Sequence, residues 1–241
     1  MTQKAQRLQV FLSHNGVCSR RQAMDIIKAG RVAVNGQEER EPSRPIDPSK
    51  DKVSVDGKDI LFQNYQYILL NKPKGYVCTK AEFKGERSIL ELLPAELRYL
   101  SPVGRLDKDT EGLLLLTNDG DLAFRLTHPK FNVDKTYVVR VTGKLKEEDK
   151  VKLERGIVVE DRKTAPAKIE SVKFLTNQSE FLMTIHEGRK RQIRIMLGTL
   201  KYPVVYLKRI SQGPLVLGDL APGTWRVLTL DEINGFKKLK I

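Results

Sequence analysis

The sequence predicts an α+β protein with a small N-terminal domain, residues 1–62, and a larger domain, residues 63–241, built on a mainly antiparallel mixed sheet. Three observations predict this architecture. Helix and turn signals fill the first sixty residues, and short strand-like segments separated by turns dominate the rest. A chain of 241 residues with 40% hydrophobic content is also long enough to bury the cores of one or two domains.

Two short helices are expected at the start of the first domain. Apolar residues between Leu8 and Leu12 have helical spacing, and Asn15-Gly16 ends this helix. Ser19 and Gln22 form a capping-box pattern, in which each side chain can bind a free backbone N–H at a helix start. The second helix therefore begins after Ser19 and ends at Ala29-Gly30.

Short strands and hairpins are expected next. Residues 31–34 alternate like a strand and close on a tight Asn35-Gly36 turn. Residues 53–55, followed by Asp56-Gly57, indicate a second hairpin. Between them, residues 38–52 are charged and contain three prolines, which predicts a loop.

The second domain is expected to alternate between strands and shorter helices. Period-two or β-branched segments predict strands at residues 67–70, 136–141, 167–174 and 181–186. Helices are expected at residues 88–92, 120–126, 146–154 and 191–200.

The charge of the chain indicates a polyanionic partner. Lys and Arg total 43 against 30 acidic residues, which gives a formal net charge of +13 and a pI near 9.7. The excess is concentrated in the second domain, because residues 1–62 hold 11 basic and 8 acidic residues and the remainder holds 32 and 22.

Several classes of protein are excluded by composition. The two cysteines and three histidines are scattered, so neither a disulfide framework nor a zinc site has the spacing it needs. Residues 1–7 are polar and no signal-peptide apolar region follows them, and no apolar run approaches the length of a membrane span. We expect a cytoplasmic protein without a membrane partner.

A candidate site lies at Gly104-Arg105-Leu106-Asp107. It places a carboxylate beside a guanidinium just before the apolar segment 112–117, which can hold both on a rigid element. Taken alone, an Arg-x-Asp tripeptide is equally compatible with a solvated ion pair on a surface turn. Three further segments stand out, at residues 71–76, 134–137 and 186–194.

The segment at 186–194 leads into a basic helix. Its apolar residues fall on one helical face, so Arg191, Arg194 and Lys201 lie along the flank and can reach a polar ligand. Residues 187–209 hold seven basic residues and one acid. A phosphate or carboxylate partner explains this density, although a solvated helix flank does so too.

The first domain resembles the αL RNA-binding domain, first seen in a ribosomal small-subunit protein. The resemblance covers about residues 5–60 and rests on Ser19-Arg20-Arg21 and on the segment from Gly30 to Gly36. It implies that one helix and its surroundings present several phosphate contacts. These contacts are Arg20, Arg21, Lys28 and Arg31.

All four segments of the second domain, in this order, resemble the signature of the pseudouridine synthases, specifically the ribosomal RNA (RsuA/RluB) group that carries an αL domain in front. Gly-Arg-Leu-Asp matches the catalytic motif, and the motif extends through residues 114–120. Lys135-Thr136-Tyr137 and residues 191–194 complete the match. One departure is Ile195, where this group commonly has another arginine.

The resemblance implies isomerisation of a uridine within ribosomal RNA to pseudouridine, without cofactor or metal. Asp107 would be the essential carboxylate, attacking the base or assisting departure of the uracil at the sugar. Burial alone favours the neutral acid, so a buried cation is needed, and Arg194 best matches the family's arginine that pairs with the aspartate. Tyr137 would stack on the target base and could act as general base.

The resemblance also implies that the uridine is turned out of its helix into the pocket. Arg105 would brace the space it leaves, and four basic residues would contact the RNA backbone. These four are Lys72, Lys74, Arg189 and Arg191. We expect a monomer whose partner is ribosomal RNA or a preribosomal particle, with large-subunit RNA favoured over small-subunit RNA.

Two other functions are compatible with parts of the sequence. The segments 107–110 and 116–118 superficially resemble aspartyl phosphatases, but here the first aspartate follows Gly-Arg rather than a hydrophobic strand, and the Thr-Asn comes only ten residues later. A non-catalytic RNA-binding or ribosome-assembly factor fits the charge equally well. It does not explain why Asp107 stands among phosphate-seeking cations.

Overall fold

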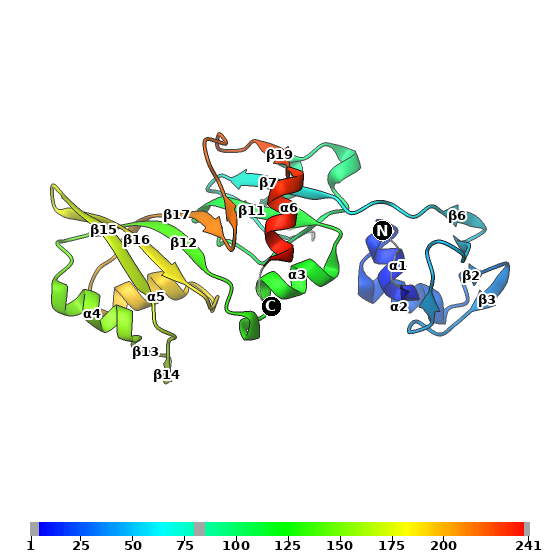
Figure 1. Ribbon diagram of the computed structural model, residues 1–241, viewed down its shortest axis with the longest axis horizontal. Coiled ribbons are helices and arrows are strands. Elements are labelled where there is room, and N and C mark those ends of the chain that lie inside the picture. Colours follow the sequence, from blue (N-terminus) through cyan, green and yellow to red (C-terminus); the bar gives the residue numbers. More distant parts are fainter. Residues whose placement is uncertain (1–4, 80–84, 239–241) are drawn as a thin grey trace. The chain divides into compact units, whose positions relative to one another are not determined.

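The computed structural model describes residues 5–79 and 85–238, and it divides into two compact units (Figure 1). One unit comprises residues 1–66 with residues 118–120, and the other comprises residues 67–117 and 121–241. No helix in the described ranges combines the length and the apolar character that a membrane crossing would need.

The N-terminal unit packs two helices against a small sheet. Helices α1 (Leu8–His14) and α2 (Arg20–Lys28) are where the sequence patterns predict them, and the Ser19–Gln22 capping box forms. The antiparallel sheet runs in the order β3-β2-β5-β6. Its strands are β2 (Val32–Val34), β3 (Gln37–Glu39), β5 (Val53–Val55) and β6 (Lys58–Ile60).

The segment expected to be a loop, residues 38–52, contains more structure than its prolines indicate. Strand β3 extends into it, and β4 (Pro45–Ile46) pairs with β1 (Gln6–Arg7). Ile46 is fully buried in the core of this unit, which accounts for the pairing, because burying an isoleucine contributes about 2 kcal/mol. The prediction of a simple loop was therefore wrong at these positions.

The second unit is built on one large mixed sheet, as the sequence predicts. The main strand order is β15-β16-β12-β17-β11-β7-β19, and all of these neighbours are antiparallel except β11 and β17. The strands are β7 (Tyr67–Lys72), β11 (Glu111–Thr117), β12 (Lys135–Thr142), β15 (Lys168–Leu175), β16 (Gln178–Ile185), β17 (Val204–Gln212) and β19 (Trp225–Val227). Short strands β10 (Ser101–Pro102) and β18 (Leu215–Val216) extend it.

Helices cover both faces of this sheet, and β7 and β11 are buried on both sides. Helices α3 (Gly120–Thr127) and α6 (Leu230–Lys237) contribute to one core, which also holds Leu113 and Leu115 (Figure 1). Helices α4 (Glu147–Arg155) and α5 (Gln192–Thr199) contribute to the core on the other face, which holds Leu114 and Leu116. This explains why the sequence shows a continuous apolar run there rather than alternation.

Not every element follows the sequence patterns. The helix expected at residues 88–92 is present as a 3₁₀ helix (η1, Ile89–Leu92), and a second 3₁₀ turn, η2 (Ala95–Leu97), follows it. Strand β17 and helix α6 were not predicted at all. Tertiary pairing decides these cases, because β17 lies between β12 and β11 in the interior of the sheet.

The contact between β11 and β17 depends on a glycine. Gly112 has a φ of +107° and lies opposite Arg209, so close that a Cβ atom would stand 2.2 Å from the Arg209 carbonyl oxygen. Arg209 is itself buried and donates from Nε to the Leu113 carbonyl at 2.8 Å. Since Arg209 is also paired with Tyr137 on β12, this contact fixes Tyr137 relative to the start of β11.

Replacing Gly112 with alanine should break this arrangement. We expect Gly112→Ala to lower the free energy of unfolding by about 3 kcal/mol, since it combines backbone strain with a clash against backbone atoms. Gly198 is the matched control, because it lies in α5 with no atom near its missing Cβ, and Gly198→Ala should raise stability by about 0.5–1 kcal/mol. Urea-unfolding midpoints measure both, and equal midpoints for Gly112→Ala and the unmodified protein would contradict the assignment.

Candidate active site

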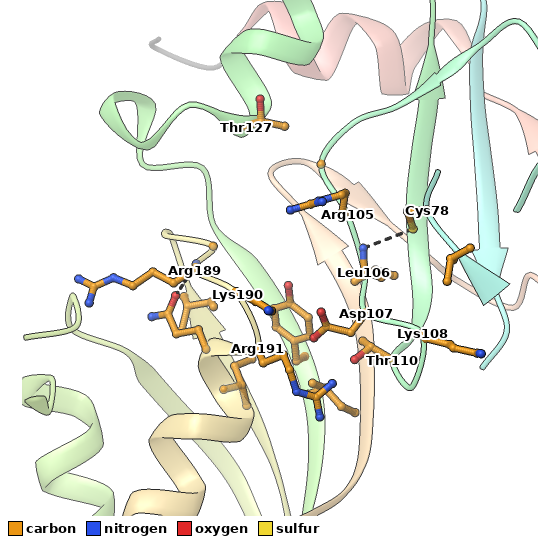
Figure 2. Close-up of a pocket in the computed structure, with 18 of the residues that line it drawn as sticks. Cys78, Arg105, Leu106, Asp107, Lys108, Thr110, Thr127, Arg189, Lys190 and Arg191 are labelled. Carbon is orange, nitrogen blue, oxygen red and sulfur yellow. Dashed lines mark hydrogen bonds between the residues drawn. The ribbon is translucent and has the colours of Figure 1, made fainter. Parts of the chain in front are cut away.

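The loop between β10 and β11 carries Asp107 into a cavity of ≈ 790 Å³. Figure 2 shows the loop with Arg105 and Asp107 on one side of this pocket, and Arg189 and Arg191 on the other. Arg189 and Arg191 belong to the segment that leads from β16 into α5. Two segments far apart in the sequence thus form opposite walls of one pocket, as the sequence motifs predict.

A buried lysine supports the loop that carries Asp107. Lys72, at the end of β7, is fully buried, and its Nζ donates to the carbonyl oxygens of Pro73 and Asp107 at 3.1 Å and of Thr110 at 2.7 Å. Burial lowers the pKa of Lys72, while nearby charges, those of Asp107 and Asp109 among them, act in the opposite direction. The expectation that Lys72 contacts an RNA phosphate was wrong, because its ammonium is out of reach of solvent and used within the fold.

Further hydrogen bonds fix the backbone of the loop. Thr110 N–H donates to the Asp107 carbonyl at 3.0 Å, and Gly75 N–H donates to the Lys108 carbonyl at 2.8 Å. On the pocket side, the Leu106 N–H points to the Cys78 sulfur at 3.5 Å (Figure 2). The position of Asp107 therefore does not depend on contacts of its own side chain.

Asp109 joins the loop to α5. Arg191 donates to both of its carboxylate oxygens, at 3.1 and 3.0 Å, and Arg194 Nε lies 3.2 Å from its Oδ2. Arg194 also donates to the carbonyl oxygens of Asp109 at 2.9 Å and Val204 at 3.2 Å. The predicted pair between Arg194 and Asp107 is thus corrected: the arginine reaches the acid two residues later, because its guanidinium is also bound to these two carbonyl groups.

The contacts of Asp109 with Arg191 and Arg194, here called the clamp, change the pKa of its carboxyl. Burial raises the pKa of its carboxyl, but the hydrogen bond from Arg191 and the charges of Arg194 and Arg191 outweigh burial and lower the pKa below its ordinary value near 3.9. A lowered pKa in the folded state means that the ion pairs contribute stability above that ordinary value and lose it as the pH falls through the lowered pKa. Because the Asp109 side chain is 45% exposed, this contribution is small.

Asp107 differs from Asp109 in having no protein partner for its carboxylate. Within residues 5–79 and 85–238, no hydrogen bond or ion pair involves its side chain, which is half-buried at the pocket wall. Its charge acts on the surrounding cations at longer range and raises the pKa of Arg191, after the larger effect of Asp109. A carboxylate surrounded by positive charge but bound to none of it is available to a ligand.

Tyr137 lines the same pocket from β12. It is 8% exposed and belongs to the main core, where Met183 and Arg209 are its neighbours across the sheet. The register of β12 against β17 shifts between Thr136 and Tyr137. The ring therefore has a fixed position at the pocket, and an aromatic side chain held this way presents a surface for stacking.

The other predicted contacts of this unit are on or near the pocket surface. Arg105 and Arg189 are exposed and line the pocket. Arg189 also donates to the carbonyl oxygens of Arg162 and Lys163, which belong to the hairpin strand β14 (Arg162–Lys163) paired with β13 (Val158–Val159). Lys74 is exposed outside the pocket, with its ammonium 5.0 Å from the centre of the Tyr206 ring.

In the N-terminal unit, Arg20, Arg21 and Lys28 are exposed on α2, as a phosphate-binding role requires. Arg31 is exposed too, but its guanidinium binds both carboxylate oxygens of Asp56, at 2.9 and 2.5 Å. An anion would have to compete with Asp56 for it.

Several pocket residues were missed from the sequence. Cys78, Thr127 and Lys190 line the pocket, and Asp109 organises its wall. Asp109 stood inside the recognised motif, yet its partners lie more than eighty residues away, so nothing local identified its role. No group of three metal-binding side chains occurs in the part of the chain that the structure describes.

Lys72 and Lys74 form a matched pair for testing the loop support. We expect Lys72→Met to lower the free energy of unfolding by about 3 kcal/mol, because three buried carbonyl groups lose a charged donor while the apolar stem is kept. Lys74→Met removes an exposed charge and should change stability by no more than about 0.5 kcal/mol. Thermal unfolding monitored by circular dichroism distinguishes the two, and equal effects would show that Lys72 does not support the loop.

Comparison with known proteins agrees with this geometry. The RNA pseudouridylate synthase family model matches residues 66–199, and the S4 domain model matches residues 6–53. The ribosomal large subunit pseudouridine synthase B of Bacillus subtilis (strain 168) is 41% identical over 236 residues, covering 97% of this chain and 96% of the relative. An uncharacterized RNA pseudouridine synthase of Aquifex aeolicus (strain VF5) is 41% identical over 228 residues, covering 94% of this chain and 92% of the relative.

A solved structure extends the likeness to three dimensions. A crystal structure of a pseudouridylate synthase superimposes with a TM-score of 0.69 at 33% sequence identity, covering 96% of this chain and 99% of that chain. The motifs around Asp107, the two-unit architecture and these matches point to one conclusion. The chain belongs to the RNA pseudouridylate synthase family and carries an N-terminal S4 domain.

Proposed function

We propose that this protein isomerises a specific uridine of ribosomal RNA to pseudouridine, and that Asp107 is the carboxylate that acts on the reacting nucleotide. The observation that carries the proposal is the position of this carboxylate: it lines the pocket with no hydrogen bond or ion pair in the described part of the chain, and the cationic Arg105 and Arg191 line the same pocket. The isomerisation moves the glycosidic bond from nitrogen to carbon within one nucleotide. It therefore needs a nucleophile or charge stabiliser and a proton acceptor, and no external reactant.

The pocket suits an extruded nucleotide. A cavity of ≈ 790 Å³ falls in the range of small-ligand sites, and its wall combines an apolar floor with charged groups at the rim. Leu106, Ile193 and Leu207 supply apolar surface for a base, and Tyr137 supplies an aromatic one. A uridine reaches such a pocket only when it leaves its helix, which costs a few kcal/mol.

The basic residues at the rim of the pocket are suited to contact the RNA around the extruded base. Arg105, next to Asp107 in the chain, is exposed and makes no hydrogen bond or ion pair within the described ranges, so its guanidinium is free to occupy the space that the base leaves. Arg189 and Arg191 stand across the pocket, where they can meet phosphates on either side of the target, and at Arg191 a phosphate would have to compete with Asp109. Arg194 acts indirectly, by holding the loop of Asp107 through Asp109.

The relative from Bacillus subtilis supports the choice of RNA. Its name assigns it to the large ribosomal subunit, and its identity to this chain extends over nearly the full length of both. We therefore propose large-subunit RNA as the substrate, modified in the cytoplasm. Maps of pseudouridine in ribosomal RNA, made with and without the protein, test this choice, and a changed uridine in small-subunit RNA alone would overturn it.

Asp107→Asn tests the role of the carboxylate. We expect pseudouridine formation to fall below detection, because an amide can neither attack nor stabilise positive charge, while RNA affinity stays within about tenfold, or 1.4 kcal/mol. Asp219→Asn is the control, since Asp219 is an exposed acid outside the pocket and its loss should leave activity unchanged. Full activity in Asp107→Asn would remove this carboxylate from the mechanism.

Asp109→Asn tests the clamp. We expect kcat to fall between about tenfold and a hundredfold, since the loop that carries Asp107 loses its ties to α5 and small displacements of a reacting group are costly. Stability should change by no more than about 1 kcal/mol, because the pair is half-exposed. Glu180→Gln is the control: it breaks a comparable pair with Arg140 outside the pocket and should leave kcat unchanged. Equal rates for both variants would show that the clamp does not position Asp107.

A further inference from the structure

An aromatic cluster lies on the surface at the end of α3. It consists of Phe124, His128 and Phe131. His128 directly precedes the short 3₁₀ helix η3 (Pro129–Phe131), and Phe131 is its last residue. The ring centre of Phe124 lies 4.9 Å from the ring centre of His128 and 5.7 Å from that of Phe131. The ammonium of Lys130 stands 5.4 Å from the Phe124 ring and 4.6 Å from the Phe131 ring.

The packing of the protein explains this cluster only in part: the His128 ring accepts a hydrogen bond from Lys130 N–H at 3.3 Å and so caps η3, but Phe124 has no such role. Phe124 is 49% exposed and belongs to none of the three cores, and His128 is exposed as well. Phe131 packs against the core that contains α3, so it anchors the other two rings. The backbone is fixed by two bonds, from His128 N–H to the Phe124 carbonyl at 2.9 Å and from Phe131 N–H to the His128 carbonyl at 3.1 Å. A large, ordered and partly exposed aromatic surface is typical of a binding site.

The cluster is next in the chain to a residue of the candidate active site. Thr127, between Phe124 and His128 in the chain, lines the pocket. In Figure 2, Thr127, Arg105 and Asp107 follow one another down the view, so the end of α3 forms one end of the pocket. Phe124 precedes Thr127 by three residues, which is about 4.5 Å along a helix axis.

We propose that the aromatic cluster binds unpaired bases of the RNA strand within a few nucleotides of the target uridine, by stacking on Phe124 and His128. This inference rests on the proposed function. Exposed aromatic rings combined with a cation suit single-stranded RNA, whose bases stack on the rings while the charge attracts the phosphates. The neighbouring rim of the pocket is cationic as well, through Arg105, Arg189 and Lys190, which favours a polyanion over an apolar protein surface.

The cluster would extend recognition beyond the pocket. The pocket would hold one nucleotide, so its contacts would depend little on the nucleotides that flank the target. A stacking surface one helical turn away selects a target whose flanking nucleotides are unpaired, and it holds the strand after the uridine has left the helix.

The test uses the full-length protein and a ribosomal RNA fragment containing a uridine that the unmodified protein converts. Phe124→Leu keeps apolar bulk and removes the ring, and Phe124→Tyr keeps the ring. We expect Phe124→Leu to raise KM roughly tenfold with kcat within about twofold, and Phe124→Tyr to retain the original KM. 2-Aminopurine placed at each flanking position in turn should be quenched at one position by the unmodified protein and by Phe124→Tyr, but not by Phe124→Leu.

Phe174→Leu is the matched control. Phe174 is 55% exposed on β15, carries Lys144 at 4.8 Å from its ring and does not line the pocket, so KM and quenching should not change. Equal KM values for Phe124→Leu and Phe174→Leu would overturn the inference. So would a defect of Phe124→Leu on preribosomal particles without one on the RNA fragment, because a protein would then be the partner. Absence of conversion by the unmodified protein on any ribosomal RNA would instead refute the proposed function.

Discussion

A buried ammonium group is the constraint on which the active-site wall depends. Lys72 lies at the end of a strand that is buried on both faces, and its charge is met by the carbonyl oxygens of Pro73, Asp107 and Thr110. Taking such a charge out of water is costly, and it persists only where the surrounding groups are arranged to bind it. Three carbonyl groups that converge on one point cannot move independently, so the loop between Asp107 and Thr110 has one conformation.

The two carboxylates of that loop, those of Asp107 and Asp109, have different surroundings. Asp109 is bound by two arginines, which tie the loop to α5 and lower its pKa. Asp107 has the same cations nearby, yet none is bound to it. Positive charge thus reaches Asp107 through space while its oxygen atoms stay available. A direct ion pair would occupy these oxygen atoms and would have to be broken before a ligand could reach them.

The sequence identified the elements and motifs but not all of their connections. Helices α1 and α2 were predictable because capping and apolar spacing are local, and the place of Asp107 at a pocket was predictable because its motif is contiguous. The partner of Arg194 was not, because a guanidinium on α5 can reach either of two aspartates that stand two residues apart in the loop, and backbone carbonyl groups decide between them. Lys72 was misassigned for a similar reason: a lysine beside Pro-Lys-Gly looks exposed until its strand is known to be interior. Strand β17 carries a mixed pattern, since its buried positions include Arg209 and Gln212, so its hydrophobicity alone does not identify it.

The burial of β7 and β11 on both faces affects the energetics of substrate binding. The loop with Asp107 ends directly in β11, and Lys72 ends β7, so the loop and its buried support both adjoin strands that are buried on both faces, the kind of element that opens least readily. Ordering these residues costs no conformational entropy when RNA arrives, because that entropy was already lost during folding. The entropic cost of recognition then falls mainly on the nucleic acid, whose unpaired nucleotides must give up their freedom to enter a preformed protein surface.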